Sequence, residues 1–240
     1  MHNDKNLPAV VILSGGYGKR LYPQTKKIPK CLIKIDSKPF LFYQLKLLEK
    51  KNFKKVIICS GYKSDQIKKF LYKNKQNFNL EILISDDGKK KLGTGGAIKK
   101  TLKILGKNFF VIFGDSYLDV DYKKIYRKFI QLNKKDLIVT HKYLKKYNIY
   151  PIFPEMIVRN NNILQYKNFK KEMTHLYYGI GVFNNLSFKD IKKKIFDLHF
   201  FFKKMILNNN LLSYTVQKKF YEIGSKYGLN ETKNFLKKNE

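Results

Sequence analysis

The sequence predicts an α/β fold with a largely parallel central sheet. Along most of its 240 residues, apolar runs of strand length alternate with stretches in which apolar residues recur at the helical period. This alternation is typical of parallel strands joined by crossover helices. The hydrophobic content of 43% is ample for a buried core, so we expect one globular domain over residues 1–240.

Five apolar runs in the first part of the chain are predicted to be strands. They lie at residues 9–13, 55–60, 80–85, 109–115 and 137–143. Between them, apolar residues share one helical face in three groups, which are Leu41, Leu45 and Leu48, then Ile67, Phe70 and Leu71, then Ile98, Leu102 and Leu105. Before the first group, Ser37 can cap a helix and Pro39 can occupy its first turn.

The regular alternation of strand and helix patterns ends at about residue 150, and beyond it the sequence predicts a mixed α+β half. The expected elements are a hairpin around Asn160–Asn162, a strand at 176–183, a helical stretch from about Phe188 to Leu207, and a strand ending in 220–225. A terminal helix follows, which Ser225 can cap. No linker or repeat separates the halves, so the division into residues 1–150 and 151–240 is soft.

The chain is strongly basic. Fifty Lys and Arg against 18 Asp and Glu give a formal charge of +32, which raises nucleic acid or an anionic membrane as a partner. However, lysines occur in nearly every segment, interleaved with Asn, Ile, Phe and Tyr, all of which have A/T-rich codons. A biased genome explains this dispersed charge better than a phosphate-binding face does, so we expect no nucleic-acid partner.

Cysteines and histidines indicate neither a disulfide framework nor a zinc site. Cys31 and Cys59 lack metal-type spacing, so we expect inert apolar thiols in a reducing cytosol. The histidines are scattered and are interpreted as structural: His2, His141, His175 and His199. The N-terminal segment lacks a basic region followed by a long apolar stretch, so we expect no signal peptide, no membrane span and a cytoplasmic location.

A glycine-rich loop follows the first predicted strand, within "SGGYGKRLYPQTKKIPK" at residues 14–30. Its glycines allow the backbone to approach a phosphate closely, and they are Gly15, Gly16 and Gly18. Lys19 and Arg20 add positive charge. The loop fits neither the dinucleotide fingerprint, because Leu21 replaces its last glycine, nor the P-loop, because Arg20 follows Lys19.

The longer pattern G15-G-x-G-x-R-L-x-P-x-T-x-x-x-P-K30 resembles the signature of the sugar-1-phosphate nucleotidyltransferases. Further blocks match that family in order: "GYKSDQI" (61–67), "LGTGGAI" (92–98), "FGDSYLD" (113–119) and "YEIGSKYGL" (221–229). The resemblance covers residues 9 to about 236. It implies a Rossmann-like, three-layer α/β/α (GT-A-like) fold with a mixed, mainly parallel sheet, in which 1–150 binds nucleotide and 151–240 binds sugar phosphate.

The resemblance implies an enzyme that condenses an NTP with a sugar 1-phosphate to give an NDP-sugar and pyrophosphate. The blocks "GDSYLD" and "YEIGS" look closest to heptose or mannose 1-phosphate guanylyltransferases, which favours GTP and leaves UTP, dTTP and CTP open. Both reactants are anions, so Mg²⁺ on two carboxylates and cationic side chains must neutralise them. An oligomer is compatible with the sequence.

The resemblance assigns catalytic roles to Arg20, Lys30 and Asp115. Asp115 is expected to bind Mg²⁺ together with Glu222, where the family more often has Asp. Arg20 is expected to contact the NTP phosphates, and Lys30 the α-phosphate or the sugar phosphate. The competing interpretations are a helix cap for Asp115 and a surface ion pair for Glu222.

The remaining assignments concern the two substrates. The nucleotide is expected to contact the glycine-rich loop and two later loops, at Gly15, Gly16, Gly18, Lys19, Gly61, Gly93, Thr94, Gly95 and Gly96. A helix N-terminus near Gly96 suits an anion, although simple turn chemistry also explains these glycines. The sugar phosphate is expected to contact Lys167, chosen over Lys170 and Lys171, and Gly179.

Two other functions use the same fold. One is a basic, non-catalytic protein that binds a nucleotide or nucleic acid. The other is a regulatory sensor that binds an NDP-sugar and releases no pyrophosphate. The intact Arg20, Lys30 and Asp115 weigh against both.

Overall fold

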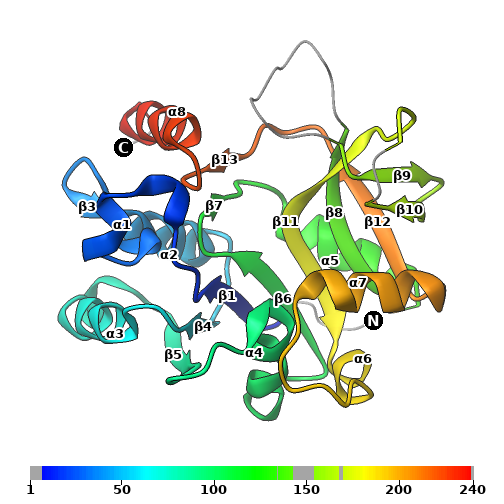
Figure 1. Ribbon diagram of the computed structural model, residues 1–240, viewed down its shortest axis with the longest axis horizontal. Coiled ribbons are helices and arrows are strands. Elements are labelled where there is room, and N and C mark those ends of the chain that lie inside the picture. The colour runs from blue at the N-terminus through cyan, green and yellow to red at the C-terminus, as the bar shows by residue number, and fades with distance from the viewer. Residues whose placement is uncertain (1–6, 134, 143–153, 168–169, 239–240) are drawn as a thin grey trace.

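The computed structural model describes residues 7–133, 135–142, 154–167 and 170–238. Within them, the chain folds around a nine-stranded sheet with helices on both sides (Figure 1). The strands follow the order β5-β4-β1-β6-β11-β8-β12-β10-β9. None of the helices in the described ranges is long and apolar enough to cross a membrane.

The first half of the chain supplies four parallel strands, which are β1 (Val10–Ser14), β4 (Lys55–Ser60), β5 (Glu81–Asp86) and β6 (Asn108–Phe113). Successive side chains of a strand point to opposite faces, so Val10 and Ile12 enter one hydrophobic core and Val11 enters another. All three are fully buried. Burial on both faces explains why this strand is an unbroken apolar run.

Helices cover both cores. The core that contains Val10 is covered by α2 (Phe40–Lys50), α3 (Ser64–Lys73) and α5 (Tyr122–Gln131). The core that contains Val11 is covered by α4 (Gly93–Thr101), α6 (Asn185–Lys189) and α7 (Leu198–Leu207). The helical spacing read from the sequence is seen in α2, where Leu41, Leu45 and Leu48 are all fully buried.

The second half makes the sheet mixed. Strand β11 (His175–Asn184) runs antiparallel to both β6 and β8 (Asp136–Lys142). Strand β12 (Leu211–Val216) is parallel to β8, and the hairpin of β9 (Met156–Arg159) and β10 (Asn162–Tyr166) completes the edge. The α/β fold, the mixed sheet and the predicted hairpin are confirmed.

The single helical stretch predicted from Phe188 to Leu207 is wrong. Helix α6 ends at Lys189, and a loop at 190–197 separates it from α7. The loop buries Ile191 and Phe196 in the core beside α4, and this packing outweighs the helical pattern.

The strand predicted to end in 220–225 is also corrected. The strand that joins the large sheet is β12, whereas only β13 (Tyr221–Glu222) forms in that segment. It pairs with β7 (Ser116–Tyr117) in a separate two-stranded sheet. The next residue, Ile223, is buried in a third core, which takes the segment away from the large sheet.

The third core joins the two ends of the chain. Its residues come from the segment after β1, from α2 and from the terminal helix α8 (Lys226–Lys237), which Ser225 caps as predicted by accepting from Gly228 N at 2.9 Å. By contrast, α2 follows Pro39 with no side-chain cap, so the cap predicted for Ser37 is wrong. The smaller elements are η1 (Lys19–Leu21), α1 (Gln24–Lys27), η2 (Lys30–Leu32), β2 (Lys34–Ile35), β3 (Lys38–Pro39), η3 (Lys75–Asn77) and η4 (Leu102–Ile104).

Candidate active site

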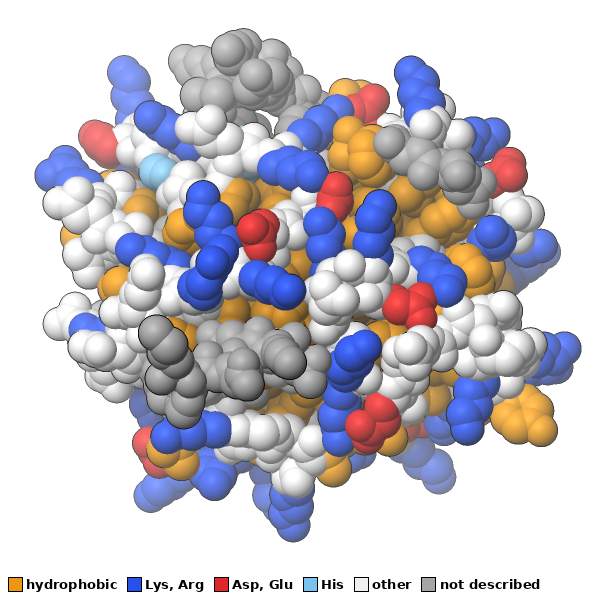
Figure 2. Space-filling view, turned by 180° about the vertical axis from the view of Figure 1, so that it is seen from behind, with side chains coloured by type: hydrophobic (Ala, Val, Ile, Leu, Met, Phe, Trp, Pro, Cys, Tyr) orange, Lys and Arg blue, Asp and Glu red, His pale blue; other side chains and the backbone are white. Residues whose placement is uncertain are grey.

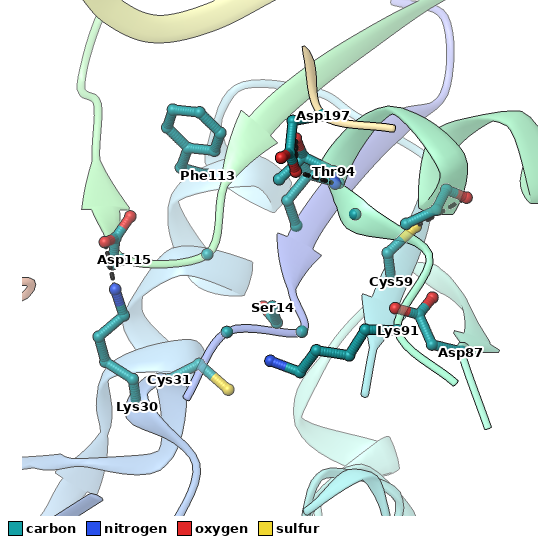
Figure 3. A pocket seen from close by; sticks show the side chains of 16 residues that line it. Ser14, Lys30, Cys31, Cys59, Asp87, Lys91, Thr94, Phe113, Asp115 and Asp197 are labelled. Carbon is teal, nitrogen blue, oxygen red and sulfur yellow. Dashed lines mark hydrogen bonds and ion pairs between the residues drawn. The ribbon is translucent and has the colours of Figure 1, made fainter. Parts of the chain in front are cut away.

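A cavity of about 390 Å³ lies beyond the carboxyl ends of the parallel strands (Figure 3). Its walls include Leu13 and Ser14 of β1, Cys59 of β4 and Phe113 of β6. This is where ligands bind in open α/β sheets, because the loops that leave the strands are free to shape a site there. The cavity therefore borders the glycine-rich loop, which is expected to contact the nucleotide.

The glycine-rich loop after β1 borders this cavity. Gly15 and Gly16 line it. Gly18 has φ +64, and a Cβ there would lie 3.0 Å from the Thr25 side chain, so the turn requires glycine. Thr25 Oγ1 donates to the Gly18 carbonyl at 2.8 Å and fixes the loop. Gly61 packs against Gly15, with Gly15 O 3.5 Å from the position of a Cβ on Gly61.

Lys30 and Asp115 meet at one end of the cavity. Asp115 lies in the turn after β6, and Lys30 begins η2 directly after Pro29. Their side chains form an ion pair between Lys30 Nζ and Asp115 Oδ2 (Figure 3). They are 19% and 22% exposed, so both stay in reach of a ligand.

Two further predicted residues converge on the same place. A Cβ built on Gly224 would lie 2.7 Å from Glu222 Oε2, 3.0 Å from Arg20 Nη2 and 3.1 Å from Asp115 Oδ2. Glu222 Oε2, Arg20 Nη2 and Asp115 Oδ2 therefore all lie around one point beside Gly224. The backbone explains this, because Ile223 N donates to Asp115 O at 2.8 Å beside the β7–β13 pairing.

The Glu222 carboxylate is already hydrogen-bonded at the start of α8. It accepts from the backbone of Gly224 and Ser225, and from the Ser225 hydroxyl. The longer side chain of glutamate can turn back in this way over its own loop.

The residues present fit Mg²⁺. Asp115 and Glu222 offer the carboxylate oxygens that this ion prefers. No group of three or more His, Cys, Asp and Glu that could hold a metal ion occurs within the described ranges. Mg²⁺ is commonly held by one or two carboxylates plus substrate phosphates, so a site of this size is sufficient.

The sequence patterns did not identify three charged residues that line the cavity, which are Asp87, Lys91 and Asp197. Asp87 follows β5, and burial raises its pKa while Leu92 N donates to its Oδ2 at 3.4 Å. Its Oδ1 is buried without a hydrogen-bond partner. Lys91 extends into the cavity from the loop before α4 (Figure 3). The signal for Asp87 and Lys91 was the pair of acids at a strand end, followed by three lysines before "LGTGG".

The helix N-terminus predicted near Gly96 is not free for an anion. Helix α4 begins at Gly93, and the amides of Gly95 and Gly96 donate to Phe196 O at 2.9 and 3.0 Å. Thr94 N donates to Asp197 Oδ1 at 3.2 Å. Gly93 and Thr94 line the cavity, whereas Gly95 and Gly96 pack against the 190–197 loop.

The predicted sugar-phosphate residues lie at different distances from this site. Gly179 has φ +87, and a Cβ there would lie 3.5 Å from Phe113, which lines the cavity. Lys167 does not line it. Its Nζ lies 3.9 Å from Glu155 Oε2, and its side chain is 46% exposed.

The other residues singled out in the sequence lie outside the group formed by Arg20, Lys30, Asp115 and Glu222. Lys19 is exposed in η1. Burial raises the pKa of the Cys31 thiol to about 12 and raises that of Cys59 further, in agreement with inert thiols. His141 and His175 are buried in the sheet, and His2 lies outside the described residues.

The sequence matches known proteins. The nucleotidyl transferase family model matches residues 9–148. The D-glycero-alpha-D-manno-heptose 1-phosphate guanylyltransferase of Aneurinibacillus thermoaerophilus is 34% identical over 158 residues, which are 65% of this chain and 66% of that protein. The mannose-1-phosphate guanylyltransferase catalytic subunit beta of Xenopus tropicalis is 33% identical over 135 residues, 55% of this chain and 37% of that protein. The chain thus spans less than two thirds of the length of either relative.

The fold also matches solved structures. The crystal structure of HddC from Yersinia pseudotuberculosis complexed with GMP-PN superposes with a TM-score of 0.78, over 96% of this chain and 100% of that chain, at 24% sequence identity. A likeness at this identity establishes the shared fold. The family match extends over more than half of the sequence and contains the glycine-rich loop, Lys30 and Asp115. This chain belongs to the nucleotidyl transferase family.

Proposed function

We propose that this protein is a magnesium-dependent sugar-1-phosphate nucleotidyltransferase that condenses GTP with a heptose- or mannose-type sugar 1-phosphate. The observation that carries the proposal is the convergence of Arg20, Lys30, Asp115 and Glu222 beside the glycine-rich loop. The names of the relatives, which are heptose and mannose 1-phosphate guanylyltransferases, support the choice of substrates. Helices on both faces of the sheet support the three-layer, Rossmann-like arrangement expected of such an enzyme.

The reaction needs positioning and charge neutralisation. An oxygen of the sugar phosphate attacks the α-phosphorus of GTP, the new O–P bond forms, and the bond to the β-phosphate oxygen breaks as pyrophosphate leaves. Negative charge develops at the α-phosphoryl group and on the leaving pyrophosphate, where Lys30 and Arg20 would act. Mg²⁺ held by Asp115 and Glu222 would supply further neutralisation of these oxygens.

The ion pair between Lys30 and Asp115 prepares the site. Because the carboxylate already holds the ammonium, Lys30 need not be ordered when the substrate arrives. The short helix η2 and the preceding Pro29 fix its backbone. In this proposal Lys30 exchanges part of its interaction with Asp115 for the α-phosphate or the sugar phosphate.

Asp87 supports guanine as the base. Guanine presents two donors on one edge, N1–H and the N2 amino group, and a carboxylate can accept from both. Asp87 lines the cavity, and one of its oxygens has no hydrogen-bond partner. We propose that Asp87 reads this edge. A carboxylate that accepts from both donors favours guanine over bases that offer a single donor at this edge.

Inosine triphosphate tests this assignment, because it lacks the N2 amino group. Wild-type protein is expected to bind GTP about tenfold or more tightly than ITP, and Asp87→Asn is expected to remove most of that preference. Dissociation constants measured by calorimetry would decide. An unchanged preference in the variant contradicts the role of Asp87.

The sugar-binding half is proposed from the family resemblance. Gly179 lies next to Phe113 of the cavity, which suits contact with a sugar. Lys167 would hold the sugar phosphate if its side chain turned from Glu155 toward the cavity. We also propose a cytoplasmic location, where GTP is available. An oligomer is compatible with this function.

A pyrophosphate-release assay tests the function itself. Wild-type protein with Mg²⁺ is assayed with GTP, UTP, dTTP and CTP, each against a panel of sugar 1-phosphates. We expect the highest kcat/KM with GTP and a heptose or mannose 1-phosphate. Folded protein that turns over no pair would contradict the enzymatic proposal.

A further inference from the structure

Lys91 and Tyr17 join two loops at the border of the cavity. Lys91 belongs to the loop between β5 and α4, and Tyr17 belongs to the glycine-rich loop. Lys91 Nζ lies 3.1 Å from the centroid of the Tyr17 ring. A cation in this position is attracted by the negative face of the ring. The ammonium is therefore held in place across the two loops.

The Tyr17 ring is itself fixed. It meets Tyr62 edge to face, with the ring centroids 5.0 Å apart and an interplanar angle of 65°. The Tyr62 hydroxyl donates to Thr25 O at 3.0 Å, and Tyr62 N donates to Gly15 O at 3.4 Å. Loops that follow three parallel strands are thus linked through these side chains. Such packing gives Lys91 a defined direction, which a solvated surface lysine lacks.

The Lys91 ammonium has no carboxylate in ion-pair contact within the described parts of the chain. By comparison, Lys30 pairs with Asp115 and Lys68 with Asp86. Burial lowers the pKa of Lys91, with Asp87 opposing this effect and Lys19 adding to it. An ammonium that borders a cavity and has no carboxylate in contact is suited to an anionic ligand.

We propose that Lys91 is a nucleotide-binding residue that contacts the pyrophosphate half of the NTP, and that Tyr17 positions it. This inference rests on the proposed function. Figure 3 shows Lys91 on the other side of the cavity from the Lys30–Asp115 pair, where the α-phosphate would react. The β- and γ-phosphates must lie away from the attacking sugar phosphate. The loop before α4 and the glycine-rich loop then hold them from two sides.

The test compares GTP with GMP, which has the same base but no pyrophosphate half. Lys91→Met removes the charge and keeps the length, Lys91→Arg keeps a charge that can stack on the ring, and Lys90→Met is the matched control on an exposed neighbour. We expect Lys91→Met to weaken GTP binding about tenfold to a hundredfold. GMP binding should be unchanged in all three variants, and Lys91→Arg should retain most of the GTP affinity.

The role of Tyr17 has its own pair of variants. Tyr17→Phe keeps the ring and should bind GTP as wild type does, whereas Tyr17→Leu should lose affinity for GTP but not for GMP. In the reverse reaction, the KM for pyrophosphate should rise in Lys91→Met while the KM for the NDP-sugar stays constant. Thermal unfolding checks that the variants remain folded.

Three results would overturn the inference. Lys91→Met could behave as Lys90→Met does, it could weaken GMP as strongly as GTP, or it could lower the midpoint of unfolding enough to explain the loss. The last two would show that Lys91 reads the base or supports the fold. Failure of wild-type protein to bind any NTP would instead overturn the proposed function, and with it this inference.

Discussion

At the reacting end of the cavity, Lys30, Asp115 and Glu222 already interact with neighbouring groups. Lys30 contacts Asp115, and Glu222 accepts hydrogen bonds from Gly224 and Ser225. Preorganised charges of this kind need little rearrangement during the reaction. An ion that binds both carboxylates would share Asp115 with the Lys30 ammonium, and it would share Glu222 with the backbone amides of Gly224 and Ser225.

Replacing Asp115 tests its role in the chemistry. Asp115→Asn is expected to lower kcat/KM for pyrophosphate release at least a hundredfold, because it removes a charge that holds both Lys30 and the ion. The thermal midpoint should change little, since the side chain is partly exposed. Asp65→Asn, at a side chain that is 97% exposed, is the control and should keep full activity. An active Asp115→Asn protein would contradict the proposed role.

Some site residues could be predicted from the sequence and others could not. Lys30 and Asp115 stand in co-linear motifs, so their types and order indicate the chemistry. Asp87 and Lys91 lie in a stretch rich in lysine, and a pair of acids at a strand end followed by lysines does not by itself separate a functional side chain from a solvated one. Asp87 is distinguished by its buried carboxylate oxygen, and Lys91 is distinguished by its contact with the Tyr17 ring.

Among the secondary-structure elements, α4 depends on the loop at 190–197. The carbonyl of Phe196 accepts from the first turn of the helix. Gly96 is required because a Cβ there would lie 2.4 Å from the Lys194 carbonyl oxygen. The glycines of "LGTGG" therefore let the loop at 190–197 approach α4 closely. Helix α4 in turn lines the cavity with Gly93, Thr94 and Ala97.

Gly96→Ala tests this close approach. We expect a loss of about 1–3 kcal/mol in the free energy of unfolding, because the backbone of the loop must shift to accommodate the methyl group. Gly106→Ala is the control, since its Cβ would meet nothing nearer than Asn108 O at 4.0 Å. Urea denaturation measures both variants. Equal stability of the two would contradict the packing role.

A buried acid joins two strands of the sheet. Asp136 begins β8, and its Oδ1 accepts from the backbone of Asn184, the last residue of β11, at 2.8 Å. Burial raises the pKa of Asp136 to about 7, against the effect of this hydrogen bond. The folded protein thus holds this proton more tightly than the unfolded chain does.

The free energy of unfolding should therefore depend on pH through Asp136. Between about pH 4 and about pH 7 the Asp136 contribution to the free energy of unfolding should fall as pH rises, by at most about 1.4 kcal/mol per pH unit. Asp136→Asn keeps the acceptor for Asn184 and should lack this contribution. Denaturation of both proteins across the range gives the difference. Parallel pH profiles would show that Asp136 does not titrate in this way.

The elements differ in how far the sequence predicts them. Strand β1, which is buried on both faces, is an unbroken apolar run and was predicted to within a residue. The break between α6 and α7 was not, because the helical pattern continues through residues that instead pack on α4. The position of β13 depends on pairing with β7, about a hundred residues earlier in the chain, which no local pattern encodes.

At the scale of the whole molecule, the basic charge is dispersed. Figure 2 shows lysine and arginine side chains scattered over one face, with neutral and apolar side chains between them. This view agrees with the interpretation that composition, and not a nucleic-acid surface, accounts for the charge of +32. The proposed function depends on a few cations at the site, above all Lys30 and Arg20.

The meeting of residues about two hundred positions apart was implied by the family resemblance and not by any local pattern. Arg20 and Glu222 lie together because the third core packs the terminal helix against the segment after β1. A crystal structure with a non-hydrolysable GTP analogue and Mg²⁺ tests this arrangement most directly. We expect one ion between the carboxylates of Asp115 and Glu222, with the triphosphate over Gly15 and Gly16. A nucleotide bound elsewhere, or an ion that contacts neither carboxylate, would contradict it.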